Sequence, residues 1–157
     1  MGMPGAKRIL VVCTGNSCRS VMAKGLLKKM LQDHGKSAMV VSAGIAALPG
    51  LRPTRETMDV MARHDIDVST HLTQRLTNDM VESADLVLVM ERIHREEILN
   101  RIPHAKKKVF LLREYAGAAS GHAADIEVPD PIAKPIDVYE SCFEMIEAAV
   151  DKVVEKI

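Results

Sequence analysis

Residues 7–20, KRILVVCTGNSCRS, join an apolar run to a turn-prone segment and then to a helical pattern. The first part, KRILVVC (7–13), predicts a buried strand because its aliphatic residues are consecutive. After Arg19 the apolar residues recur at helical spacing, at Met22, Leu26, Leu27, Met30 and Leu31. A strand, a tight corner and an amphipathic helix in this order are typical of an α/β fold.

The same alternation continues along the chain. Further strands are expected at 37–44, 85–90 and 107–112, and further helices at 53–65, 77–84, 92–102 and 137–157. Pro53 is expected to begin its helix in the first turn, Pro103 to end the helix before it, and Asp137 to cap the last helix. Strands that alternate with helices predict a single-domain, three-layer, doubly wound α/β fold, with a four-stranded parallel sheet and helices on both faces.

The composition limits the class of function. The 157 residues, 47% of them hydrophobic, suffice for one core, so we expect one domain spanning 1–157. Basic and acidic residues both number 21, giving zero formal net charge, and aromatic residues make up 3%. This composition argues against a nucleic-acid partner. No apolar run approaches the ~20 residues of a membrane span, which argues against a membrane protein.

The three cysteines, Cys13, Cys18 and Cys142, follow neither a disulfide framework nor a zinc-ligand spacing. The first residues also lack the apolar core of a secretory signal. Together these features predict a cytoplasmic protein that needs no metal or other cofactor.

The corner after the first strand has the composition of an anion site. Ligands of doubly wound sheets bind beyond the carboxyl ends of the strands, and N–H groups entering a helix favour negative charge there. Gly15 and Asn16 are expected to supply the positive φ angles that such a cradle needs. Cys13 begins the segment and Arg19 closes it, so a thiol that ionises readily faces a guanidinium able to bind two oxygens of a phosphoryl group. Ser20 is placed to donate a hydrogen bond to Cys13.

For two of these residues, a purely structural role is an alternative at this point. Cys13 could be a buried core residue with Arg19 on the surface. The candidate for the proton donor to a leaving group is Asp130, in VPDPIAKP (128–135), where two prolines could hold it over the cradle. Its alternative is an ordinary Asp-Pro turn.

Four motifs, VCTGNSCRSVMA (12–23), SAG (42–44), ADLVLVM (84–90) and the late DP (130–131), resemble the low-molecular-weight protein tyrosine phosphatase family. The similarity covers about residues 7–155. It implies that Cys13 forms a cysteinyl-phosphate, that Arg19 and the loop N–H groups bind the phosphoryl oxygens, and that Asp130 protonates the leaving group and then activates water.

The resemblance also implies supporting roles. The phosphate-binding loop would comprise Thr14, Gly15, Asn16, Ser17, Cys18 and Ser20. Asn16 would be left-handed and anchored by Ser42. His71 would belong to the same network, with a plain surface histidine as the alternative. Cys18 would trap oxidised Cys13 as a reversible disulfide.

The substrate side chain is suggested by departures from the tyrosine-specific pattern. Ser17 stands where those enzymes carry a bulky aliphatic residue, and Ile132 and Ala133 stand where they carry aromatics. A small hydroxyl residue at position 17 resembles the bacterial protein-arginine phosphatase branch, so phosphoarginine is preferred to phosphotyrosine. The partners would be phosphorylated proteins and an opposing tyrosine or arginine kinase.

Three rival functions share the fold or the nucleophile. A thioredoxin-coupled arsenate reductase needs further cysteines near 80–90, and the sequence has none there. A non-hydrolytic phosphocysteine carrier domain would not combine Arg19 with Asp130. An inactive phosphate-binding module would have no use for a complete set of chemical residues.

Overall fold

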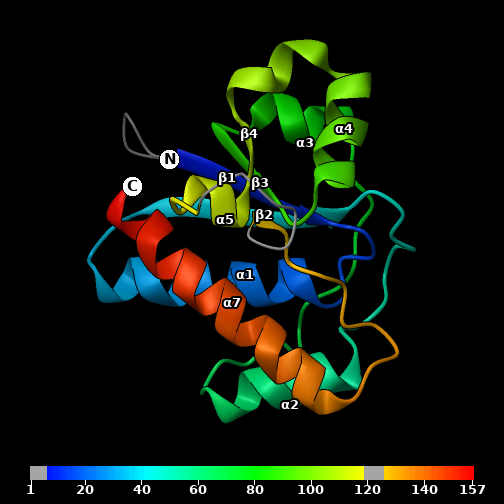
Figure 1. The fold of residues 1–157 in the computed structure, drawn as a ribbon, viewed down its shortest axis with the longest axis vertical. Helices are drawn as coiled ribbons and strands as arrows, with labels where there is room; N and C mark the ends of the chain where they lie inside the picture. Colours follow the sequence, from blue (N-terminus) through cyan, green and yellow to red (C-terminus); the bar gives the residue numbers. More distant parts are fainter. Residues whose placement is uncertain (1–6, 119–125) are drawn as a thin grey trace.

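The computed structural model describes residues 7–118 and 126–157. Its centre is one parallel sheet of four strands in the order β2-β1-β3-β4 (Figure 1). The strands are β1 (Lys7–Cys13), β2 (Ala38–Gly44), β3 (Leu86–Val89) and β4 (Val109–Leu111). Cys13 pairs with Gly44 at the end of β1, and Val12 pairs with Val89 of β3. The chain segments that leave these three strands therefore start side by side at one edge of the sheet.

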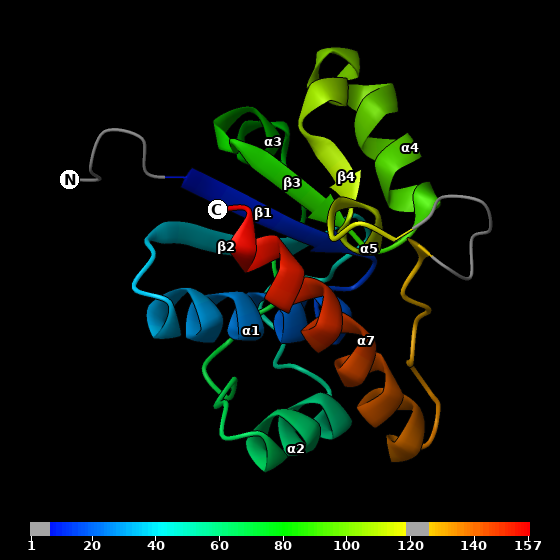
Figure 2. The same ribbon diagram turned by 60° about the vertical axis from the view of Figure 1, so that its left-hand side comes forward.

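Helices cover both faces of the sheet, as Figure 2 shows from the side. One face carries α1 (Arg19–Asp33), α2 (Arg55–Arg63), α5 (Leu112–Tyr115) and α7 (Ile136–Glu155). The other face carries α3 (Asn78–Ser83), α4 (Arg92–Arg101) and the 3₁₀ helix η1 (Pro103–Lys107). The expected doubly wound, three-layer α/β fold is confirmed.

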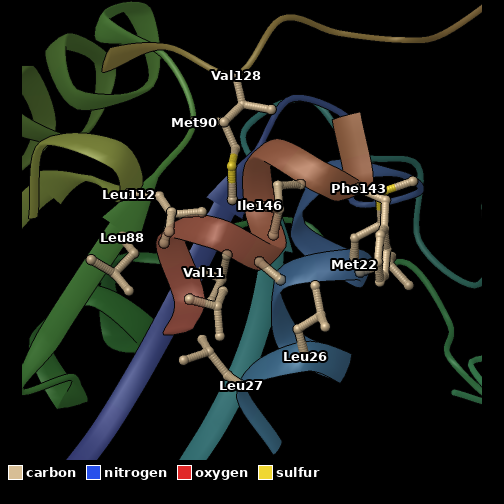
Figure 3. Close-up of a cluster of buried hydrophobic side chains, with 14 of the residues drawn as sticks. Val11, Met22, Leu26, Leu27, Leu88, Met90, Leu112, Val128, Phe143 and Ile146 are labelled. Carbon is tan, nitrogen blue, oxygen red and sulfur yellow. The ribbon is translucent and has the colours of Figure 1, made fainter. Parts of the chain in front are cut away.

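The two layers of core diverge from β1, whose side chains alternate between the faces of the sheet. Ile9 and Val11 pack into the larger cluster under α1 and α7, whereas Leu10 and Val12 pack against the α3–α4 side. Figure 3 shows the larger cluster, with side chains of α1 and α7 meeting over Val11. Burial on both faces explains why the strand sequence is a continuous apolar run.

The ends of several elements differ from expectation. The second helix begins at Arg55 with Thr54 as its N-cap, so Pro53 precedes the helix instead of starting it. Pro103 begins η1 as well as ending the α4 region, because a proline suits the first turn of a helix. The N-cap of α7 is Pro135, and Asp137 lies inside the first turn, where its charge favours the helix dipole without capping it.

The expected strand 107–112 is shorter than its apolar pattern. Only Val109–Leu111 pairs with β3, and the chain turns directly into α5, whose first residue, Leu112, was expected to end the strand. Leu112 is buried beneath α7. Its apolar side chain therefore packs against a helix and does not belong to the sheet.

Across the described parts of the chain, none of the helices combines the length and hydropathy needed to span a bilayer.

Candidate active site

The site is built around the sulfur of Cys13, the last residue of β1. Cys13 is 2% exposed, and its Sγ accepts a hydrogen bond from the backbone N–H of Asn16 at 3.3 Å. Ser20 Oγ, in the first turn of α1, lies 3.0 Å from the same sulfur. The turn between β1 and α1 thus curls back so that its polar groups face the sulfur.

Asn16 holds this turn in shape. It has φ 55° and is fully buried, whereas Gly15 is not in the left-handed region, so the expectation that both residues take positive φ is wrong for Gly15. The amide of Asn16 donates to Ser20 Oγ at 2.8 Å and to Ser42 Oγ at 3.0 Å, and it accepts from the N–H of Gln74 at 3.0 Å. A short amide side chain tolerates the left-handed conformation and satisfies its own polar atoms here.

His71 supports the loop from the opposite side. Its Nε2 donates to the carbonyl of Asn16 at 3.0 Å, and its Nδ1 lies 2.9 Å from Nζ of Lys24. His71 is 8% exposed, so the alternative of a surface histidine is wrong. Burial lowers the pKa of His71 and, together with Lys28, that of Lys24. A neutral ring can donate to Asn16 and accept from Lys24 at once.

Gly44, at the end of β2, allows the loop to lie this close to the sheet. A Cβ atom on Gly44 would stand 2.5 Å from the carbonyl oxygen of Thr14 and 2.8 Å from the nitrogen of Asn16. Beyond it, the N–H groups of Ile45 and Ala46 donate to the carbonyls of Cys13 and Thr14, both at 3.0 Å. The strand end therefore serves as the backing of the phosphate loop.

Arg19 is 1% exposed, so the alternative of a surface arginine is wrong. Its NH1 group donates to the carboxylate of Glu91 and, at 2.8 Å, to the carbonyl of Val128. Burial lowers the pKa of Arg19, but the negative charges around it, beginning with Cys13, outweigh this, so its pKa is raised. The guanidinium is therefore charged at any working pH.

The other guanidinium nitrogen faces the pocket. NH2 of Arg19 lies 3.4 Å from Thr14 Oγ1 and 3.4 Å from Oδ2 of Asp130. Since NH1 is tied to the protein, NH2 is the part of the guanidinium placed toward the open side of the loop.

Glu91 and His94 are site residues that the sequence reasoning missed. Glu91 is the N-cap of α4, directly after β3, and its backbone N–H donates to Nδ1 of His94 at 3.0 Å. Nε2 of His94 lies 2.9 Å from Oγ1 of Thr14. The signal that could have found them is their position directly after a predicted strand, because all strands of a parallel sheet end at the same edge.

Asp130 lies at the mouth of the site. Its side chain is 38% exposed, and its Oδ1 accepts from the N–H of Ile132 at 3.0 Å, which keeps Oδ2 toward Arg19. A pocket of about 210 Å³ opens here, lined by Cys13, Thr14, Gly15, Ser17, Cys18, Arg19, Asp130 and Ile132. The structure thus brings together all the residues expected at the site, with Asn16, Ser20, Ser42 and His71 behind the lining.

Cys18 is buried in the pocket wall, and its sulfur contacts hydroxyl groups. Its sulfur is 3.5 Å from Oγ1 of Thr54, the N-cap of α2, and its thiol donates to the hydroxyl oxygen of Tyr139 at 4.0 Å. Burial, reinforced by Cys18, raises the pKa of Tyr139 to about 12. The hydroxyl of Tyr139 is therefore neutral, and its oxygen accepts the hydrogen bond from this thiol.

No three His, Cys, Asp or Glu side chains lie close enough to hold a metal ion in the parts of the chain that are described, 7–118 and 126–157.

Comparison with known proteins assigns the chain to a family. The family model for low molecular weight phosphotyrosine protein phosphatases matches residues 8–157. A probable low molecular weight protein-tyrosine-phosphatase, EpsP of Ralstonia nicotianae, is 40% identical over 151 residues, which are 96% of each chain. The protein-arginine-phosphatase of Bacillus subtilis is 35% identical over 139 residues, 88% of this chain and 89% of that protein.

A solved structure extends the likeness to three dimensions. It is a cysteine-to-serine mutant of the YwlE arginine phosphatase with a phosphorylated active-site serine. It superposes with a TM-score of 0.86 at 33% identity, covering 95% of this chain and 94% of that one. Since sequence, fold and family model agree over nearly the whole chain, this protein belongs to the low molecular weight phosphotyrosine protein phosphatase family and is a cysteine-dependent protein phosphatase.

Proposed function

We propose that Cys13 is the nucleophile of this phosphatase. Its sulfur attacks phosphorus, the S–P bond forms, and the bond from phosphorus to the leaving oxygen or nitrogen breaks as Asp130 gives its proton to the leaving group. Water then attacks the cysteinyl-phosphate, Asp130 takes a proton from the water, and the S–P bond breaks to release phosphate. Arg19 and the loop N–H groups stabilise the charge on the transferred phosphoryl group.

The contacts of the sulfur support this assignment more than any other observation. Sγ of Cys13 lies at the end of a strand, with a loop N–H 3.3 Å away and a hydroxyl 3.0 Å away, in a pocket that Arg19 and Asp130 also line. A buried thiol that served only packing would not need these polar neighbours.

We infer further that phosphoarginine is the preferred substrate side chain. The described lining of the pocket contains Ser17, Ile132 and the carboxylate of Asp130, and no aromatic ring. The half-exposed side chain of Asp130 at the mouth suits a guanidinium group, which can both donate a hydrogen bond to it and receive its proton as the P–N bond breaks. A phenol ring would lack an aromatic partner for stacking.

Phosphotyrosine is the second candidate, and one feature of the mouth favours it. Ile132 is 49% exposed at the pocket, where its side chain could pack against a phenol ring. The relative with 40% identity is also named a probable tyrosine phosphatase.

The arsenate reductase alternative has less support. Besides Cys13 and Cys18, the chain has only Cys142, which is 4% exposed in the middle of α7. Burial raises the pKa of Cys142 to about 12, so it is a poor thiol for relaying a disulfide. The carrier and inactive-module alternatives would make no use of Asp130 in the same pocket as Cys13.

The partners would be phosphorylated proteins, with a tyrosine or arginine kinase acting in opposition. A nucleophile that must stay reduced suits the cytoplasm.

Two peptides of identical sequence, one carrying phosphoarginine and the other phosphotyrosine, test the proposal. Wild-type protein is expected to show the higher kcat/KM on phosphoarginine. Ser17→Ile narrows the mouth with an aliphatic wall and is expected to shift the ratio toward phosphotyrosine, while Ser17→Thr, which keeps a hydroxyl, should leave it in place. A ratio unchanged by Ser17→Ile would remove Ser17 from the specificity argument, and a wild-type preference for phosphotyrosine would overturn the substrate assignment.

A further inference from the structure

The side chain of Thr14 joins the phosphate loop to α4. Thr14 follows Cys13 in the chain, is half-buried and lines the pocket. Its Oγ1 lies 2.9 Å from Nε2 of His94 and 3.4 Å from NH2 of Arg19. The wall of the pocket therefore contains a hydroxyl group whose two polar neighbours are nitrogen atoms.

The contacts of His94 decide which ring nitrogen carries the proton. The backbone N–H of Glu91 donates to Nδ1, so Nδ1 has no proton. His94 is fully buried, and burial, followed by the charge of Arg19, lowers its pKa to about 4. The ring is neutral at pH 7, and its single proton is on Nε2. His94 is thus the donor to Thr14.

The hydroxyl proton of Thr14 needs a hydrogen-bond acceptor. Its oxygen accepts from His94, and a guanidinium can only donate, so it also accepts from Arg19. Both lone pairs are then occupied. Within residues 7–118 and 126–157, no acceptor for the proton of Thr14 is present. An oxygen of a phosphoryl group bound in this pocket would be such an acceptor.

We propose that the hydroxyl of Thr14 donates a hydrogen bond to a non-bridging oxygen of the bound phosphoryl group, and that His94, held by Glu91, is the positioning residue that turns the hydroxyl that way. The assignment rests on the phosphoryl site proposed above and is independent of which side chain carries the phosphate. A donor oriented in advance toward an anion costs no reorganisation when the anion binds.

Binding of inorganic phosphate, measured by titration calorimetry on the full chain, tests the role of Thr14. Thr14→Val keeps the shape of the side chain but removes the hydroxyl, and Thr14→Ser keeps the hydroxyl. Thr14→Val is expected to weaken phosphate binding about 10- to 100-fold, as for a hydrogen bond to a charged group, and Thr14→Ser by about three-fold or less. An unchanged Kd in Thr14→Val would overturn the proposal.

Two variants of His94 separate its two hydrogen bonds. Asparagine places an acceptor near the position of Nδ1 and keeps the bond from Glu91, but it cannot reach Thr14. Glutamine places a donor near the position of Nε2 and keeps the bond to Thr14. His94→Asn is therefore expected to weaken phosphate binding as Thr14→Val does, and to add nothing in the Thr14→Val background. His94→Gln should bind phosphate nearly as wild type does.

Equal losses in the two His94 variants, or an additive loss in the double variant, would contradict the assignment. A further measurement needs no variant at all: ¹⁵N NMR of histidine-labelled wild-type protein should show the Nε2-protonated form of His94, and an Nδ1-protonated ring would overturn the proposal. If the phosphate affinities of wild type and the variants follow the expected order but wild-type protein hydrolyses neither phosphopeptide, the proposed function fails while the role of Thr14 stands.

Discussion

Asn16 shows how one residue can connect segments that lie far apart in the sequence. Its side chain binds Ser20 of α1, Ser42 of β2 and the backbone of Gln74, and its carbonyl accepts from His71. The left-handed conformation costs about 1 kcal/mol in a residue with a Cβ. The buried hydrogen bonds offset this cost, because leaving such an amide unpaired would cost about as much or more.

Gly44 and Gly15 make a matched pair for testing the backing of the loop. Gly44→Ala places a methyl group against the Thr14 carbonyl and is expected to lower the free energy of unfolding by about 1–3 kcal/mol. Gly15→Ala meets only Ser17 Oγ, at 3.5 Å, and is not in the left-handed region, so it should change stability by about 1 kcal/mol or less. Urea unfolding of both variants measures this. Equal losses would mean that the glycine at the end of β2 is not selected by contact with the loop.

Cys18 is expected to protect Cys13 against peroxide. Peroxide oxidises the Cys13 thiolate to a sulfenic acid, and Cys18 displaces water from it to form a disulfide, which a dithiol then reduces. Wild-type protein should regain most of its activity on dithiothreitol treatment after a peroxide pulse, and Cys18→Ser should remain largely inactive. Cys142→Ser is the control, since that buried thiol in α7 should not affect recovery. Full recovery of Cys18→Ser would remove the protective role.

At the scale of elements, α2 is tied to the active site and α3 is not. Thr54 caps α2 by accepting from the N–H of Thr57, and its own N–H donates to the carbonyl of Ser17 at 3.2 Å. Thr77 caps α3 in the same way, through the N–H of Met80. Both caps are threonines in extended conformation, so they can be compared directly.

Thr54→Ala and Thr77→Ala are each expected to lower the free energy of unfolding by about 1 kcal/mol, the usual cost of a lost N-cap. Only Thr54→Ala removes a contact of the Cys18 sulfur, so only this variant should change the rate at which iodoacetamide alkylates Cys18. Thermal melts and mass spectrometry measure the two effects. A changed Cys18 rate in Thr77→Ala would show that the rate reports general loosening instead.

The elements themselves could largely be predicted, because long apolar periodicities determine which faces are buried. β1 and α1 follow directly from the pattern around Cys13. The short elements η1 and α5 could not be predicted, since each spans about one turn and is stabilised by tertiary packing, such as Leu112 against α7, and not by its own periodicity.

At the scale of the whole molecule, the fully buried His94 makes stability depend on pH. Its pKa is lowered from 6.5 to about 4 by burial first and Arg19 second. The unfolded chain therefore binds a proton between these two values that the folded protein does not bind. The contribution of His94 to the free energy of unfolding is fully present above pH 6.5. It is lost as the pH falls toward 4, by up to about 3 kcal/mol.

His94→Gln cannot titrate, so its melting temperature should fall less between pH 6.5 and 4 than that of wild type. The pKa of His71 is lowered in the same direction and leaves part of the slope in both proteins. Calorimetric melts across this range measure the difference. Parallel curves for the two proteins would show that His94 is not held neutral by the fold.

The loop residues could be predicted because they are contiguous in the sequence. Asp130 could be predicted because two prolines flank it and the family resemblance marks it. Glu91 and His94 could not be predicted because they reach the site only through the order of strands, which places the end of β3 beside the end of β1. A pattern within one segment does not contain that neighbour relation. The hydrogen-bond partners of the buried Arg19 can therefore be identified only once the order of the strands is known.

Arg19 has its hydrogen-bonding partners at residues 14, 91 and 128, so its geometry exists only after segments from both halves of the chain have met. During denaturation, the loss of phosphatase activity should therefore coincide with cooperative unfolding of the protein and not precede it. A chain cut between α3 and β3 would retain the nucleophile but have no means of orienting the cation beside it. For this architecture, enzymatic rate is a direct measure of the fraction of molecules that are completely folded.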